Sequence, residues 1–504
     1  MIRNTLIFIG AGLLLTQLSA IAQPIVPGSG YYHDALDYSQ NELLGTARMQ
    51  AIGGAKVALG ADMSSAAVNP AGLAFFNKSS ITFSPGLYVL NSRATYLGSQ
   101  SPDFKAPLGV ASFGVVFNNE MEGPTGDWRG GNLAITHTRL NTYHERITYE
   151  GDLTGVNEYD DFVGYALNDL DQYGYDGATN LAALAYDTYV ILGPDDGFDG
   201  FVTSVYAPTA DLPTRQAEVI EVSGKKNLFN IAYSANYKDK LYIGGGVGII
   251  STERSIVRAY EERPTPQDTM PLANLIIDDV LNQNGRGFNV NFGAIYRPVK
   301  FLMIGASYES PTFIGMSENW EQTMSSSFTS NYFVEDVAGT TQQYTYASDG
   351  DFEFEMITPQ RFRGGVSVFL GKRGFVSADV EYVDYTQAAV TIDGVSTNQD
   401  NTNINTLYTS ALNYSLGGEV REGNFYGRLG YAYRQDPVKN GISPVSRDVR
   451  YFTGGVGFRK DKVFVDLALV NGRTNSEWNR YAGGAYATVA NREMRFISTI
   501  GFNF

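Results

Sequence analysis

The sequence predicts an all-β fold: a 14-stranded antiparallel transmembrane β-barrel with an N-terminal hatch in its lumen. Three observations predict it. Segments of roughly ten residues alternate apolar and polar side chains, the connections between them are alternately short and long, and the N-terminal stretch lacks any strand pattern. The composition agrees, because 55 Gly, 33 Tyr and 29 Phe among 504 residues are typical of a large β protein. The absence of Cys suits a chain that crosses an oxidising compartment.

The alternation is clearest in the C-terminal half. In residues 425–434, Phe425 and Leu429 lie on one predicted face, and Arg428 and Arg434 on the other. Charged side chains that recur this regularly cannot lie in a dry core without partners. One face therefore suits lipid and the other a polar lumen. The same pattern recurs in residues 375–385 and 412–421.

The connections support the same fold, since outer-membrane barrels alternate short periplasmic turns with long external loops. Short polar turns are predicted at residues 238–240, 297–300, 371–374, 422–424 and 459–462. Long polar stretches are predicted near residues 150–215, 260–285, 311–349, 387–408, 435–447 and 473–487. The fourteen strands between these marks are 79–96, 106–118, 132–149, 216–237, 241–258, 286–297, 301–310, 350–370, 375–386, 409–421, 425–434, 448–458, 463–472 and 489–504. An even number of strands places both ends of the barrel in the periplasm, and the first three strands alternate least well.

The N-terminus carries a targeting signal. Arg3, an apolar stretch over 6–15 and the small-residue site Ala20-Ile21-Ala22 predict a signal peptide of residues 1–22. A single membrane anchor fits less well, because the apolar core is too short. Residues 23–78 are rich in Gly, Ala and Ser, and we expect them to form a hatch inside a barrel of residues 79–504. A disordered periplasmic tail is the alternative.

The charge balance excludes one class of function. With 37 Lys and Arg against 53 Asp and Glu, the formal net charge of -16 argues against nucleic-acid binding. After the leader, no run of about 18 apolar residues could form a spanning helix. Outer-membrane localisation in a Gram-negative bacterium is the compartment that these features predict.

Residues 45–73 carry a recognisable string. It contains Gly53, Asp62 and the sequence Asn69-Pro70-Ala71, and it resembles the N-terminal hatch of the FadL/TodX family of outer-membrane transporters. The resemblance implies passive uptake of a long-chain fatty acid, an aromatic hydrocarbon or a similar hydrophobic compound. It implies a hatch-blocked barrel whose kinked third strand opens sideways.

Carried onto this chain, the resemblance places Asn69, Pro70 and Ala71 against that third strand, within residues 132–149. His137 and His144 mark this approximate lateral gate. Asn can bond its own backbone and Pro fixes the chain, so the motif suits a close contact with the wall. Here the mature chain would start with a longer segment, Gln23 to Leu44, with Asp34, Asp37 and Glu42. The pocket residues of the family therefore cannot be transferred.

Several motifs suggest other chemistry. The run Gly244–Gly248 lacks the Lys-Ser/Thr of a phosphate loop, and small lumen-facing strand residues explain it better. The loop at 195–200 lacks the glutamate of a calcium site at its twelfth position, where Tyr206 stands. His137 and His144 are seven residues apart, so a straight strand would put them on opposite faces. We expect no metal, no cofactor and no catalytic residues, although haem ligation by one His, or a barrel enzyme pairing His with a loop aspartate, stays open.

The expected partners are a hydrophobic small molecule, outer-membrane lipid and lipopolysaccharide. The terminal strand ending Phe502-Asn503-Phe504 is typical of a signal for the barrel-assembly machinery. A monomer is expected. The alternative function is a binding or secretion-accessory barrel that docks exported proteins through long loops such as 150–215 and 311–349.

Overall fold

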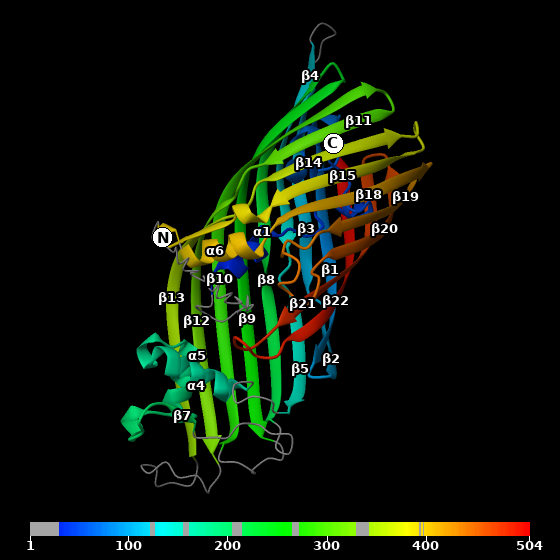
Figure 1. Cartoon of the computed structure of the whole chain (residues 1–504). Coiled ribbons are helices and arrows are strands. Elements are labelled where there is room, and N and C mark those ends of the chain that lie inside the picture. The colour runs from blue at the N-terminus through cyan, green and yellow to red at the C-terminus, as the bar shows by residue number, and fades with distance from the viewer. Residues whose placement is uncertain are drawn as a thin grey trace, which may run out of the picture.

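The protein is a closed barrel of antiparallel strands, shown in Figure 1. The computed structural model describes residues 30–120, 127–154, 161–203, 214–264, 272–328, 342–392, 395–396 and 398–504. The predicted signal peptide and the start of the mature chain lie outside these residues. No helix in the described part is long and apolar enough to cross a membrane.

Twenty strand segments form one continuous sheet. They are β1 Ser80–Tyr96, β2 Ser99–Lys105, β3 Leu108–Glu120, β4 Trp128–Asn141, β5 Glu145–Leu153, β8 Thr214–Tyr237, β9 Leu241–Pro264, β10 Leu272–Val299, β11 Leu302–Glu309, β12 Phe313–Phe328, β13 Gln342–Ile357, β14 Arg361–Phe369, β15 Gly374–Asp384, β16 Ala389–Ile392, β17 Val395–Ser396, β18 Ser410–Glu422, β19 Phe425–Arg434, β20 Val449–Lys460, β21 Val463–Trp478 and β22 Ala487–Asn503.

These segments make fourteen wall strands, because six wall strands consist of two segments each. The interrupted pairs are β2–β3, β4–β5, β11–β12, β13–β14, β15–β16 and β17–β18. Pro107, Pro311 and Pro359 interrupt three of them, since proline cannot donate to the ladder. The predicted strand number is confirmed.

The barrel closes where β22 pairs with β1, from Ser80 opposite Asn503 to Thr95 opposite Thr488. The Phe504 amide donates to the Ser79 carbonyl at 2.9 Å. The terminal strand is therefore the closing seam of the wall, and no free edge remains there.

Two predicted loops are wrong. Stretches 260–285 and 311–349 are largely strand, because β9 runs to Pro264, β10 starts at Leu272 and β12 runs to Phe328. These strands continue past the apolar belt, where the outer face carries exposed polar residues such as Asn319 and Glu321 of β12 instead of lipid-facing ones. The outward side chains are no longer apolar there, although the backbone hydrogen-bond ladder between the strands continues.

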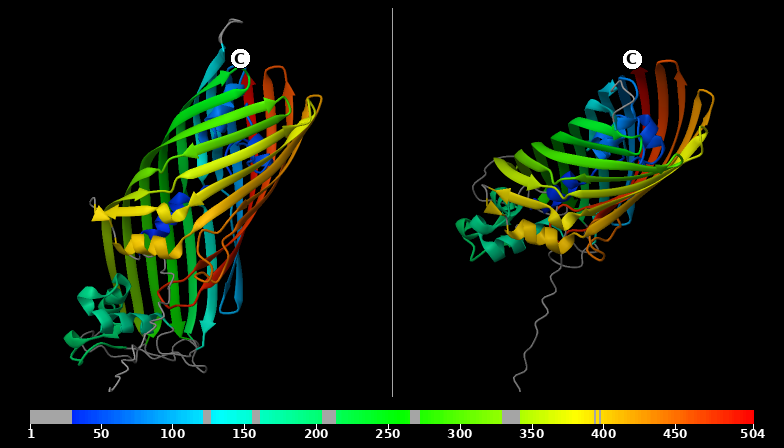
Figure 2. Two further views of the ribbon diagram at one scale, coloured as in Figure 1. Left: turned by 45° about the horizontal axis from the view of Figure 1, so that its top comes forward. Right: turned by 90° about the horizontal axis from the view of Figure 1, so that it is seen from above.

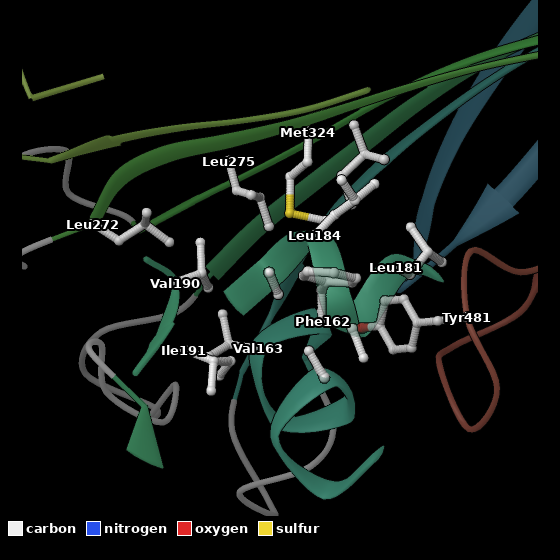
Figure 3. Close-up of a cluster of buried hydrophobic side chains, with 14 of the residues drawn as sticks. Phe162, Val163, Leu181, Leu184, Val190, Ile191, Leu272, Leu275, Met324 and Tyr481 are labelled. Carbon is white, nitrogen blue, oxygen red and sulfur yellow. The ribbon is translucent and has the colours of Figure 1, made fainter. Parts of the chain in front are cut away.

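The long connection after β5 is a small folded unit. It contains α4 Phe162–Tyr173, η2 Tyr175–Gly177, α5 Asn180–Asp187, β6 Ile191–Leu192, η3 Pro194–Asp196 and β7 Val202–Thr203. Figure 3 shows its apolar side chains meeting Leu272, Leu275 and Met324 of the wall. These wall residues are buried and alternate with outward ones, so the unit covers the lumenal side of the extended strands β9–β12. We call it the external cap. A second connection contains η4 Tyr385–Gln387 and α6 Asn398–Leu407.

The N-terminal segment, residues 30–78, lies inside the wall, where its helices are blue in Figure 2. We call it the hatch segment. It contains α1 Tyr32–Ser39, α2 Ala47–Ala51, α3 Ser65–Val68 and η1 Pro70–Phe75.

Candidate functional site: hatch, third strand and lumen cavity

Asn69 joins the hatch segment to the wall. Its side chain caps η1 by accepting from the Ala71 amide at 3.1 Å, and Pro70 opens that helix. Its Nδ2 donates to the Val57 carbonyl at 2.7 Å and lies 3.4 and 3.3 Å from the carbonyl oxygens of Ala294 and Ala306. One buried amide therefore ties two parts of the hatch segment to β10 and β11.

The expected place of this motif is wrong. Asn69-Pro70-Ala71 lies against β9, β10 and β11, not against the third wall strand. Gly244 of β9 faces Pro70 and Gly293 of β10 faces Asn69, so small wall residues permit the close approach. From Asn69, η1 follows the inner side of the wall past β9 and β8 to β4, where Asn132 donates to the Leu73 carbonyl at 2.7 Å. The motif thus reaches the third strand only through its downstream end.

Gly53 and Asp62 determine the local conformation of the hatch segment. Gly53 has φ +65, and a Cβ there would lie 2.7 Å from the Tyr431 carbonyl oxygen, so a side chain would be strained and would clash. The buried carboxylate of Asp62 accepts from the Thr46 hydroxyl at 2.7 Å and from the Ser64 amide at 2.9 Å. Both residues are structural and neither faces the lumen cavity.

Arg48 forms a charged contact between the hatch segment and the wall that the sequence analysis does not predict. The Arg48 Nε donates to Glu419 of β18 at 3.1 Å, and Glu419 also accepts from Arg428 of β19 at 2.7 Å. All three side chains are buried. The sequence signal was present, since Glu419 and Arg428 stand on the polar face of two strongly alternating strands.

The third wall strand is broken at residues 142–144, between β4 and β5. On the β4 side of the break, β3 and β4 pair from Ser112 opposite Thr138 to Glu120 opposite Gly130. On the β5 side, among the described residues, no backbone ladder joins β2 to β5. At the same level β2 ends and β3 starts with Leu108, which is 83% exposed.

Side chains replace the missing ladder. Asp103 of β2 accepts from the Thr148 hydroxyl at 2.6 Å and from the Arg146 Nε at 3.3 Å. Lys105 crosses the break and donates to Glu221 at 2.8 Å and to the Val222 carbonyl at 3.0 Å, both on β8. We call these contacts the side-chain seam.

The two histidines lie on opposite sides of the wall. The His137 ring stacks on the exposed Phe113 on the outer face, with ring centroids 4.9 Å apart. His144 lies in the break and lines a cavity in the lumen. Neither belongs to a group of three His, Asp or Glu side chains able to hold a metal, in the part of the chain that the structure describes.

The hatch segment seals the break from inside through Glu42. Its amide donates to the Leu140 carbonyl at 2.9 Å, and its carboxylate accepts from the Thr142 amide at 2.9 Å. The carboxylate also pairs with Arg495 of β22 at 2.7 Å, and Arg495 pairs with Glu493 as well. Burial raises the pKa of Glu42 to about 7, and the competition with Glu493 for one guanidinium adds to this rise. Glu42 belongs to the segment upstream of the recognised string, so the resemblance could not assign it.

A cavity of about 350 Å³ lies behind the break. Tyr143 and His144 line its wall side, and Leu36, Asp37 and Glu42 of the hatch segment line its other side. The lining combines apolar and charged side chains, unlike a purely hydrophobic pocket.

Comparison with solved structures identifies the fold. No protein-family model matches the sequence, and neither does any curated protein. A FadL homologue of Pseudomonas aeruginosa is similar with a TM-score of 0.57 and 10% identity, over 92% of this chain and 100% of that chain. The toluene transporter TodX of Pseudomonas putida is similar with a TM-score of 0.52 and 14% identity, over 92% and 100%.

The chain has the FadL/TodX fold. The resemblance first read from residues 45–73 is thereby confirmed for the architecture of nearly the whole chain. The fold is that of an outer-membrane β-barrel, as predicted.

Proposed function

We propose that this barrel takes up a hydrophobic small molecule passively, such as a long-chain fatty acid or an aromatic hydrocarbon, and releases it sideways through the break in its third strand. Solved structures with the same fold include a FadL homologue and a toluene transporter, which supports this class of cargo. Outer-membrane lipid and lipopolysaccharide would surround the barrel, which would act as a monomer inserted by the barrel-assembly machinery.

One observation carries the proposal: a lumen cavity meets a stretch of the described wall where two neighbouring segments, β2 and β5, lie side by side without a backbone ladder. On the hatch side of this barrier, Glu42 bonds Leu140 and Thr142 and the Tyr38 ring contacts Tyr143; the wall itself contributes only the side-chain seam among the described residues. Apolar cargo can pass such a barrier directly into lipid, without crossing the hydrated outer surface.

A reversible cross-link tests this route. The chain has no Cys, so an E42C/T142C pair would form the one disulfide that holds the hatch segment in the break. Uptake of radiolabelled oleate and toluene is measured in proteoliposomes before and after reduction. We expect little uptake when the pair is oxidised and an increase of at least about tenfold on reduction, since reduction leaves the break without its carboxylate.

The matched control is S367C/S377C, whose hydroxyl groups face each other at 2.8 Å between the paired strands β14 and β15. Its oxidation should leave uptake unchanged. Equal uptake by oxidised and reduced E42C/T142C would refute the lateral route. If neither probe is taken up and exported proteins co-purify in fixed ratio, the secretion-accessory function is favoured instead.

A further inference from the structure

The lumen cavity contains a carboxylate that no cation neutralises. Glu145 starts β5, directly after the break, and shares the inward register of Ile147 and Tyr149. Its Oε1 accepts from Asn491 Nδ2 of β22 at 2.6 Å. No Lys, Arg or His lies within ion-pair distance of this carboxylate among the described residues, so its charge is open to the cavity.

The arginines around the cavity are already occupied. Arg495 pairs with Glu42 and Glu493. Arg254 pairs with Asp34 and Asp37 at 2.8 Å each, and Arg447 pairs with Glu477 at 2.8 Å.

The remaining lining arginine, Arg473, is exposed and stands in the outward register of β21, where water screens its charge. Carboxylates therefore exceed available guanidinium groups inside the cavity, and Glu145 is the unmatched one.

Independent polar atoms point to a ligand in the same place. Thr142 is 7% exposed and its hydroxyl has no partner. The Trp478 indole N–H and the Asn491 Oδ1 are buried without partners too, and all three residues line the cavity. A buried polar atom without a partner costs roughly 1–3 kcal/mol, so a hydrogen-bonding occupant is favoured over a hydrocarbon.

We propose that the cavity binds an amphipathic organic cation, with its ammonium group on Glu145 and its apolar part against Leu36, Val222 and Ile256. Tyr143 and Trp478 add aromatic faces that favour a cation. This inference rests on the proposed function of passive uptake and narrows its cargo, because a cavity that prefers a cation should take an amphipathic ammonium compound in preference to a fatty acid or a hydrocarbon. Binding of such a cation in the cavity is expected whether or not the barrel transports it.

Four probes with one ring and different heads test it: benzylammonium, benzyl alcohol, benzoate and toluene. Binding is measured by calorimetry on the full chain in nanodiscs. We expect benzylammonium to bind at least about tenfold more tightly than benzyl alcohol, and benzoate to bind most weakly. E145Q keeps the shape and the Asn491 contact, so it should remove the benzylammonium advantage and leave benzyl alcohol unchanged.

E321Q is the matched control, because Glu321 is exposed on the outer face of β12 and has no part in the cavity. It should bind every probe as the wild type does. Heat-dependent electrophoretic mobility confirms that each variant forms a barrel. Tighter binding of benzoate or toluene, or an unchanged benzylammonium affinity in E145Q, would overturn the proposal.

Uptake of toluene by proteoliposomes that contain the same protein separates the two ideas. Selective benzylammonium binding without any uptake would leave this inference standing and remove the transport proposal. Uptake of toluene with no cation preference in binding would do the reverse.

Discussion

Removal of the Glu42 carboxylate should detach the hatch segment from the break. In E42A the Thr142 amide loses its acceptor, and Arg495 loses one of two carboxylates but keeps Glu493 and the Leu43 carbonyl at 3.1 Å. The arginine is therefore not left alone, and the cost is mainly the hydrogen bond to the Thr142 amide, which becomes a buried donor without a partner. We expect a loss of about 2–3 kcal/mol in the free energy of docking this segment.

Hydrogen exchange measures this loss directly. The amide of residue 42 donates to Leu140, and E42A retains that backbone group. Its exchange should accelerate by about 30- to 150-fold, because about 1.4 kcal/mol corresponds to a factor of ten. E42Q keeps an acceptor for Thr142 and should accelerate it by less than about tenfold. If exchange in E42A stays within about threefold of the wild type, Glu42 does not hold the break closed.

Three further predictions follow from named contacts. Docking of the hatch segment should weaken as pH rises. The pKa of Glu42 near 7 lies above the ordinary carboxyl value, so the stabilisation from this group is complete below about pH 4.5 and is lost as the pH rises through 7. E42Q should abolish this pH dependence in exchange rates corrected for the intrinsic effect of pH. G305A should displace the hatch segment at a cost of about 1–3 kcal/mol, because its Cβ would lie under 3.0 Å from the Val57 carbonyl, whereas G364A on the opposite face meets only Val380 at 3.7 Å. Proteolysis of residues 30–78 would show the difference, and equal protection of both variants would contradict the contact. F162A should loosen the external cap by about 3–5 kcal/mol and expose it to protease, unlike Y173A, whose ring is 57% exposed; equal cleavage would refute the core in Figure 3.

The sequence predicts the wall well where lipid imposes a pattern. In β18 and β19, apolar residues must face lipid and charged ones the lumen, so alternation revealed both strands within about two residues. Beyond the membrane both faces of the wall meet polar surroundings. β12 and residues 342–349 of β13 therefore lack the apolar signal and are predicted as a loop, although the ladder between the two strands is continuous from Phe313 to Phe328.

The candidate site was predictable only in part. The string around Asn69 located the hatch segment, because its residues cap, turn and approach the wall in one fixed order. The sequence does not predict the break, since Thr142 and Tyr143 are good strand formers and residues 142–144 contain no Gly or Pro. It depends instead on Glu42, a residue about 100 positions away that takes hydrogen bonds a neighbouring strand would otherwise use.

The side-chain seam explains why strands two and three are the place to separate. β2 and β5 lie side by side without a backbone ladder, whereas opening a laddered pair such as β8 and β9 would leave many amides and carbonyls without partners in lipid. At the seam the ties are half-exposed contacts such as Arg146 with Asp103, worth about 1 kcal/mol or less each. Glu42 supplies the remaining hydrogen bonds from the hatch side, so movement of one short segment removes them. The wall can thus open at one point while the rest of the barrel, held by ladders and by the buried pairs of Arg48, Glu419 and Arg428, keeps its shape.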